Sequence, residues 1–594
     1  MLQRLSALLA GTLILASIAR ADDLSWVEES NRYAQVLLDV LAKYNPEAAS
    51  AQGVEGHDAD VVDLKPRFDE RAEADLAAAA TKLTAERDKV SDARVKQDID
   101  ILVASANQQR NSSVLNRRLM QPYQDLTKAI FTGFHGLLDD RVPKKRQAAA
   151  VKRLHRYVGA ENGYEPITTL ARARIEERLD DTSLTAPWVV EVEQDLKNTD
   201  RFLDGIRELF EKSGLKGWKG DFATLSTQIH AYSDWIRTAV LPHARQTNRL
   251  PPEIYADNLK NFGVEMDPHQ LMDRAQVAYQ TTRDELDSLA RQVSKAKGLP
   301  SSDYRDVIRA LKKEQVADDQ LLAKYRGVLG QIEDIVRREH LVTLPTREAV
   351  IRIGTEAESA AGPAPHLDPP RLIGNTGEPA AFVLPISNPN ADSGVEMDDF
   401  KYDAITWTLT AHEARPGHEL QFARMLEHGV STARVVYALN SANVEGWALY
   451  MEAVMKQYEP PEAQICTLQM RLMRAARAML DPMLNLGMIE PDAAKQFLMQ
   501  EIVLSEPMAK QEIDRYTFRA PGQATAYFYG YSKLQALRTS AEMALGKHFE
   551  AQAFHDFIAN QGVLPLDLLA RTVMEDFVAA QLKASPAAGA TAAQ

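Results

Sequence analysis

The sequence predicts a mainly α-helical protein, a large helical array with a small inserted β-sheet. Apolar residues recur at three- and four-residue spacing, between Pro and Gly residues, from about Leu24 to about Arg338. Short β-type runs begin near residue 341, and helical spacing returns from Asp403 to about Lys583. We find no repeat of fixed period and therefore expect an irregular array.

Residues 1–21 are typical of a cleaved secretory signal peptide. Arg4 precedes an apolar run from Leu8 to Ala19, and the small-residue segment Ala19-Arg20-Ala21 closes it. A membrane anchor is the weaker alternative, because the run is shorter than the roughly 20 apolar residues of a membrane span. No cysteine follows the small residues, so a lipid anchor is not expected. The segment predicts a secreted, periplasmic protein with no membrane contact after signal cleavage.

The charge balance excludes some classes of partner. Cleavage would remove Arg4 and Arg20 and change the formal net charge from −14 to −16. An acidic protein is a poor candidate for binding nucleic acid or an anionic membrane. The single cysteine, Cys466, cannot form an internal disulfide and fits a small buried hydrophobe in a helix.

Two helical regions flank the predicted sheet. Residues 22–340 are predicted to form the N-terminal helical region, and residues 401–583 a second helical region that holds the candidate catalytic residues described below. Residues 584–594 are a low-complexity tail that we expect to be disordered. The clearest helical segments of the first region are Trp26–Tyr44, Ala72–Thr84, Val90–Ala106, Pro143–Tyr157, Pro187–Ser213 and Pro268–Lys297.

Residues 341–400 are predicted to hold a small β-sheet and loops. The strand candidates are Leu341–Pro345, Val350–Gly354 and Ala380–Pro385. The last run ends in a proline, which suits an edge strand because it cannot donate to a ladder. Such a strand could align an extended peptide substrate. The alternative is that it only covers the core.

The stretch 407–426 carries the main chemical signal. His412-Glu413-x-x-Pro416-Gly417-His418 resembles the zinc-hydrolase signature H-E-x-x-H but is two residues longer. On a regular helix, a step of six residues leaves the second imidazole roughly 120° off the face of the first. A straight helix would therefore not bring both histidines to one ion.

The two additional residues of the motif, Pro416 and Gly417, favour a break in the helix between the histidines. Pro416 cannot donate to the backbone oxygen of His412, and Gly417 permits backbone angles that other residues avoid. We therefore expect a kink, bulge or broken turn that swings His418 back toward a metal. The alternative is a helix that ends at Arg415 and a second helix that begins at His418, with no metal.

A carboxylate for the third position lies 27 residues further on. Two imidazoles and one carboxylate are a known ligand set of catalytic zinc. Glu445 can supply the carboxylate from the next helix, where it lies among apolar residues. Glu452, seven residues later and on nearly the same helical face, is a rival ligand or a partner that orients a histidine.

A third stretch, Glu512–Tyr531, is rich in tyrosine and arginine. Four tyrosines, two arginines and a glutamine could supply donors for an oxyanion and a grip on a substrate carboxylate. The alternative is aromatic core packing, with Arg515 paired to Glu512 or Asp514.

Together, the three stretches resemble the bacterial proteins catalogued as domain of unknown function 885. A weaker likeness begins at Asn45-Pro46-Glu47-Ala48-Ala49, so the resemblance covers nearly the whole mature chain. The matching motifs are His412-Glu413-x-x-Pro416-Gly417-His418-x-x-Gln421, Glu445-Gly446-Trp447-Ala448-x-Tyr450-x-Glu452, Glu512-x-Asp514-Arg515-Tyr516 and Pro521-Gly522-Gln523-Ala524-x-x-Tyr527-x-x-Gly530. That family is grouped with helical zinc peptidases of the glutamate-ligand type, such as angiotensin-converting enzyme and carboxypeptidase Taq. The resemblance implies a deep cleft and a zincin-like catalytic part.

The resemblance also implies roles for single residues. His412, His418 and Glu445 would bind one zinc ion per chain, and Glu413 would be the general base. Tyr527 and Arg515 are candidates for contacts to the transition state or the substrate. This chain has Asn485 where relatives commonly have a histidine, which puts a substrate or proton-transfer role of that position in doubt.

The sequence thus predicts a secreted zinc metallopeptidase that acts on a peptide substrate. Glu413 would take a proton from zinc-bound water and pass it to the leaving amine. The alternative is an exported, non-catalytic peptide-binding protein on a peptidase-like scaffold, suggested by the stretched histidine spacing and by Asn485. A serine or cysteine hydrolase is disfavoured, because the sequence has no G-x-S-x-G motif and no histidine close to Cys466. Oligomeric state is not predicted.

Overall fold

The computed structural model describes residues 5–385, 388–389 and 397–584. Residues 1–4 of the expected signal peptide and 585–594 of the expected tail lie outside the described residues. Within the part that is described, no helix has the length and apolar character that a membrane span requires.

The protein is mainly helical with a small three-stranded sheet, as the sequence predicts. The N-terminal half comprises α1 (Leu5–Tyr44), α2 (Pro46–Gln52), α3 (Phe68–Arg87), α4 (Ala93–Leu119), α5 (Leu126–Leu138), α6 (Lys144–Gln147), α7 (Ala149–Tyr157), α8 (Ile167–Glu176), α9 (Val189–Ser213), α10 (Lys219–Trp235), α11 (Pro252–Asn261), α12 (Pro268–Lys297), α13 (Tyr304–Lys312) and α14 (Asp318–Arg338). All six helical segments singled out in the sequence lie within or overlap these helices.

Helix ends follow local sequence signals. Helix α12 begins where the Asp267 side chain accepts from the backbone N–H of His269 at 2.9 Å, with Pro268 in the first turn. It ends at Gly298, whose φ of 65° is left-handed and favours glycine. Buried Leu271, Ala275 and other apolar residues at three- and four-residue spacing then fix the face that packs inward.

The sheet follows α14 and contains β1 (Val350–Ile353), β2 (His366–Asp368) and β3 (Ala381–Leu384), with α15 (Glu356–Ala361) between the first two strands. Its order is β1-β3-β2, with β1 parallel and β2 antiparallel to β3. The expected edge position of the last strand is therefore wrong, since β3 is central. Pro385 is compatible with this position because it follows Leu384, the last paired residue.

The strand expected at Leu341–Pro345 does not form. Side chains, rather than a neighbouring strand, take the polar backbone groups of this segment. Thr343 N–H donates to Asp556 Oδ1 at 2.8 Å, and the backbone oxygen of Leu341 lies 2.7 Å from His555 Nδ1. Leu341 itself is buried in the helical core. The apolar run thus covers helices without entering the sheet.

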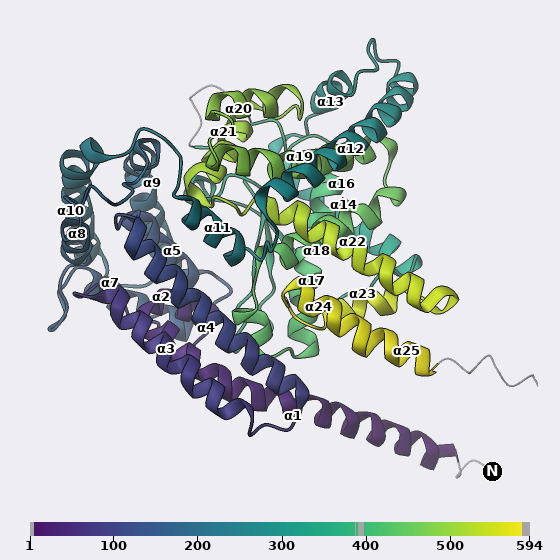
Figure 1. Ribbon diagram of the computed structural model, residues 1–594, viewed down its shortest axis with the longest axis horizontal. Coiled ribbons are helices and arrows are strands. Elements are labelled where there is room, and N and C mark those ends of the chain that lie inside the picture. Colours follow the sequence, from purple (N-terminus) through teal and green to yellow (C-terminus); the bar gives the residue numbers. More distant parts are fainter. Residues whose placement is uncertain (1–4, 386–387, 390–396, 585–594) are drawn as a thin grey trace, which may run out of the picture.

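The C-terminal half returns to helices. These are α16 (Ile405–Leu409), η3 (Thr410–Ala414), α17 (His418–His428), η4 (Ala433–Tyr437), α18 (Ser441–Met455), α19 (Pro461–Asn485), α20 (Pro491–Gln500), α21 (Glu506–Asp514), η6 (Arg515–Arg519), α22 (Thr525–Leu545), α23 (Ala551–Ala559), α24 (Leu566–Thr572), η8 (Val573–Val578) and α25 (Ala579–Ala584). Figure 1 shows α2–α5 and α7–α10 toward the left of the molecule and α12–α14 and α16–α25 toward its top and right, with α11 between them. Helix α1 runs along the bottom, and α15 packs on α9.

Candidate metal centre

The helix that carries the first histidine breaks before the second. Helix α16 continues into the π-turn η3, and Arg415 then adopts an extended backbone with φ −123° and ψ 136°. Helix α17 starts at His418. At Gly417 a Cβ would lie 1.9 Å from the backbone oxygen of His412, so the turn requires a glycine. The broken turn expected from Pro416 and Gly417 is present.

The break brings both imidazoles to one carboxylate. Glu445 Oε2 lies 3.5 Å from His412 Nε2 and 3.2 Å from His418 Nε2. One ligand atom from each residue lies within 4.8 Å of the other two, and both histidines are buried. In a tetrahedral zinc site, ligand atoms about 2.1 Å from the ion are about 3.4 Å from one another. The distances from Glu445 Oε2 to the two imidazole nitrogens are therefore compatible with zinc.

Glu452 and Glu445 have different positions around His412. Glu452 Oε1 lies 2.6 Å from His412 Nδ1, on the side of the ring away from Glu445, and 3.3 Å from Arg474 Nη2. A carboxylate on Nδ1 fixes the ring and leaves Nε2 available for a metal. The geometry therefore places Glu445 among the donors and Glu452 behind one of them.

The charges of the site suit a cation. Burial alone would lower the pKa of His412, but Glu413, Glu445 and Glu452 together raise it to about 9. Burial would raise the pKa of Glu445, yet the two imidazoles hold it well below its usual range. Carboxylates thus stabilise positive charge at this point. Among the described residues, His418 Nδ1 is buried without a hydrogen-bond partner.

Two glycines let the helices that carry Glu445 and Tyr527 cross closely. A Cβ on Gly530 of α22 would lie 1.9 Å from the backbone oxygen of Ala442 in α18. A Cβ on Gly446 would lie 2.6 Å from the backbone of Gly530. Only glycine fits on both sides of this contact. Glu445 is next to the crossing and Tyr527 is one turn before it, so the crossing places both at the site.

Gln523 fixes the second oxygen of Glu445. Its Nε2 lies 3.3 Å from Glu445 Oε1 and 2.7 Å from Ser441 Oγ. Since Oε1 is held in this way, Oε2 faces the imidazoles. Ser441 was not identified from the sequence, because a serine at the start of a helix is common.

Tyr527 covers one imidazole. Its ring stacks on His412 with centroids 6.2 Å apart and an angle of 13°. Arg515 Nη2 donates to the Tyr527 hydroxyl at 2.7 Å, while Arg515 Nη1 lies 3.7 Å from Glu512 Oε1. Arg515 therefore makes both the ion pair with Glu512, which the core-packing alternative expected, and a hydrogen bond to Tyr527 at the site. Because Arg515 occupies an acceptor position of the hydroxyl, the phenolic hydrogen can point elsewhere.

Two arginines of α19 were missed by the sequence reasoning. Arg477 lies over the Tyr527 ring at 4.5 Å and pairs with Glu512 at 2.7 Å. Arg474 lies over the same ring at 5.7 Å. No spacing rule links them to Tyr527, because they come from a helix about 50 residues earlier in the chain. The signal in the sequence was their position among the apolar residues of one helix-forming run.

Asn485 has a structural position. Its Nδ2 donates to the backbone oxygen of Tyr516 at 3.0 Å and lies 3.1 Å from Asp481 Oδ1. Asp481 in turn accepts from the backbone N–H of Gly522 at 2.9 Å. Asn485 thus ties the end of α19 to η6, and Asp481 ties the same helix to Gly522. The departure from the family pattern at Asn485 therefore leaves the three donors in place.

Glu413 lies beside the three donors, and its carboxylate is available to a substrate or a water molecule. Its Oε1 is 3.9 Å from His412 Nε2, and within the described ranges it makes no hydrogen bond. A carboxylate in this position can take or hold a proton next to a bound ion. The three donors do not line the large cavity of the protein. A cavity of about 1430 Å³ is lined by Asn440 and Tyr529 and by none of the three donors.

Comparison with known proteins identifies a family. The family model described as "Bacterial protein of unknown function (DUF885)" matches residues 46–573. The solved structure of a candidate lipoprotein from Colwellia psychrerythraea is 19% identical, with a TM-score of 0.73, over 93% of this chain and 99% of the other. A candidate lipoprotein of unknown function from Shewanella oneidensis is also 19% identical, with a TM-score of 0.70, over 93% and 100%. These two likenesses show the fold.

One further solved structure has a peptidase name. PZ peptidase A with an inhibitor is 10% identical, with a TM-score of 0.24, over 86% of this chain and 97% of the other. A likeness of this size supports no conclusion about fold or chemistry. No curated protein matches the chain.

Proposed function

The chain belongs to the bacterial DUF885 family, and from its buried His–His–Glu group we propose that it is an exported zinc-dependent hydrolase that cleaves peptide bonds. The observation that carries the proposal is the convergence of His412 Nε2 and His418 Nε2 on Glu445 Oε2. The segment 1–21 and the description of two similar structures as candidate lipoproteins support export.

His412, His418 and Glu445 would hold the ion, with Glu452 fixing the first ring. A zinc ion bound there would lower the pKa of a coordinated water toward about 7 and would polarise a carbonyl group. Glu413 Oε1 then accepts a proton from the attacking water and passes it to the leaving amine. Both proton transfers require only that the Glu413 carboxylate can reach the attacking water and the leaving amine.

Tyr527 is suited to stabilise the developing oxyanion. Burial is the main reason that its pKa is raised, so the phenol keeps its proton near neutral pH. Arg515 donates to the same oxygen and thereby makes the phenol a stronger donor. Arg515 acts through Tyr527 in this arrangement, and its side chain keeps 20% of its surface exposed for a substrate group.

Strand β2 is the part of the sheet that fits an extended peptide. It is an edge strand, and it contacts η3, the turn that contains His412 and Glu413. A peptide could add to its free side by backbone hydrogen bonds. β2 therefore takes the aligning role that the sequence reasoning gave to the run ending in Pro385.

The test is metal analysis followed by digestion of a peptide library, with and without chelator. We expect about one zinc per chain and cleavage that chelator abolishes. Glu413→Gln should keep the zinc and lower kcat by about 100-fold or more, as loss of a general base does. The proposal is refuted if the metal-free protein still cleaves no peptide of the library after zinc is added.

Neither of the two observations that suggested a non-catalytic protein requires one. The stretched histidine spacing is compatible with three converging donors, and Asn485 holds backbone segments away from them. No contact among the described residues favours a binding-only role.

A further inference from the structure

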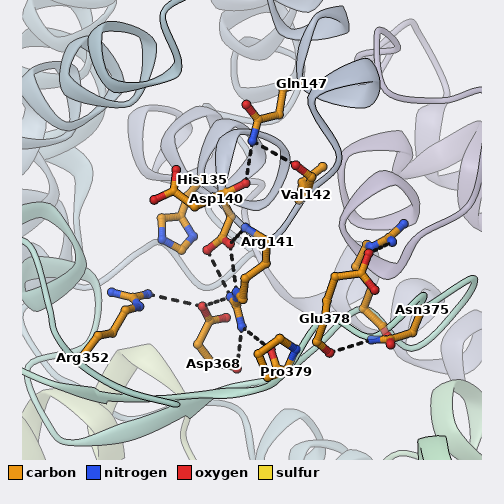
Figure 2. A network of polar contacts seen from close by, with 12 residues as sticks. His135, Asp140, Arg141, Val142, Gln147, Arg352, Asp368, Asn375, Glu378 and Pro379 are labelled. Atoms are coloured by element: carbon orange, nitrogen blue, oxygen red, sulfur yellow. Dashed lines mark hydrogen bonds and ion pairs between the residues drawn. The ribbon is translucent and has the colours of Figure 1, made fainter. Parts of the chain in front are cut away.

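An ion network joins the N-terminal helices to the end of strand β2 (Figure 2). Arg141, which follows α5, reaches the sheet, and its Nη1 donates to the backbone oxygens of Asp368 and Pro379, each 3.2 Å away. Its Nη2 also pairs with the Asp368 carboxylate, and its Nε donates to Asp139 Oδ1 at 2.8 Å. Asp368 ends β2 and Pro379 precedes β3, so one guanidinium ties two strands together.

Strand β1 and helix α5 join the same network. Arg352 of β1 has its Nη2 3.3 Å from Asp368 Oδ2 and 2.7 Å from Glu358 Oε1. His135 of α5 also lies 2.7 Å from Glu358 Oε1. Although burial would raise the pKa of Glu358, His135 and Arg352 hold it far below its usual range. The cations and carboxylates are matched, so loss of Arg141 would leave a partly buried carboxylate short of a partner.

The position of β2 matters because this strand lies against the candidate metal centre. It contacts η3, which carries His412 and Glu413. Its central residue, Leu367, packs against the same apolar cluster, formed by Phe422, Met425, Val435 and Val563, as Val444, the neighbour of Glu445. Within the described part of the sheet, only β3 pairs with β2. Displacing the end of β2 would therefore displace the free edge beside the donors.

We infer that Arg141 is a positioning residue for peptide hydrolysis, which holds the free edge of β2 where an extended peptide can pair with it. The inference rests on the proposed function. Arg141 belongs to the N-terminal region, and its described contacts reach the sheet but neither imidazole nor Glu413. It acts through β2, so it should influence substrate alignment and leave metal affinity unchanged.

The experiment compares Arg141→Ala with wild type in zinc content, kcat and KM on one peptide substrate. We expect KM to rise about tenfold, with kcat within about twofold, because binding common to substrate and transition state is lost. Zinc content should not change. Arg141→Lys keeps the charge, but three donors on a single nitrogen cannot reproduce the contacts that the planar guanidinium makes to Asp139, Asp368 and Pro379 together, so it should recover only part of the loss. Arg207→Ala, which removes an exposed i,i+3 pair with Asp204, is the matched control.

A second readout separates this inference from the proposed function. Binding of the same peptide is measured to Glu413→Gln and to Glu413→Gln with Arg141→Ala, where about tenfold weaker binding is expected for the double variant. A wild type that binds but never cleaves defeats the proposed function alone. Unchanged KM and binding, or loss of zinc, in a folded Arg141→Ala protein overturns the positioning role. If Arg141→Ala does not fold, Arg141→Gln is measured by the same criteria.

Discussion

Gly417 offers a direct test of the broken helix. A Cβ there would lie 1.9 Å from the backbone oxygen of His412 and 2.5 Å from that of Ala411. Real Cβ atoms are essentially never closer than 3.0 Å to such an atom, so Gly417→Ala must shift the backbone by roughly 1.1 Å or more. Metal–ligand distances tolerate only about 0.2 Å. We therefore expect the zinc affinity of Gly417→Ala to fall by about 100-fold or more.

The assay is a competition titration of zinc against a chelator of known affinity, with circular dichroism to verify folding. Gly327→Ala is the control, because Gly327 lies inside α14 and a Cβ there would meet nothing within 4 Å. Its zinc affinity should stay within about twofold of wild type, and its stability should rise slightly. A folded Gly417→Ala protein with wild-type zinc affinity would refute the inference that the turn places His418.

Two further predictions concern the surroundings of His412 and the helical core. Glu452→Gln should weaken zinc binding by about 10- to 100-fold, because it removes the carboxylate 2.6 Å from His412 Nδ1; the same competition titration measures it, and unchanged affinity would contradict the assigned role. His555 should make the fold acid-sensitive, since burial lowers its pKa to about 4, whereas an unfolded histidine titrates near 6.5. The unfolded state therefore binds the proton first as pH falls, so stability is lost below about pH 6.5 and the loss from this residue is about 2 kcal/mol between pH 7.5 and pH 5. Urea unfolding of wild type and His555→Gln at both pH values isolates this contribution, and an equal loss in both proteins would rule it out.

Local rules predicted the elements whose cause is local. Periodicity located the long helices, and Pro416 with Gly417 predicted the break between the histidines. The choice between Glu445 and Glu452 was beyond such rules. The two residues are seven apart on one helix, so both lie on nearly the same face. Only the position of the His412 ring, with one nitrogen toward each carboxylate, distinguishes them.

Long-range pairing explains what the sequence could not show. The order β1-β3-β2 places β3 in the centre, although its terminal proline suggested an edge. Strand β2 has only three residues, and its sequence His366-Leu367-Asp368 shows no β-type run. Arg474 and Arg477 reach Tyr527 from another helix, and Arg141 reaches the sheet from the N-terminal region. Such contacts depend on how distant segments pack.

The break after Ala414 also changes what an ion would do for the chain. In an H-E-x-x-H helix, both imidazoles belong to one helix, whereas here the donors come from η3, α17 and α18. An ion held by all three would act as a cross-link, and at a free concentration 100 times its Kd it would add about 2.7 kcal/mol to folding. The chain has a single cysteine, Cys466, and so no disulfide of its own. Under the proposed function, metal supply would then set how long the protein survives proteolysis, as well as whether it is active.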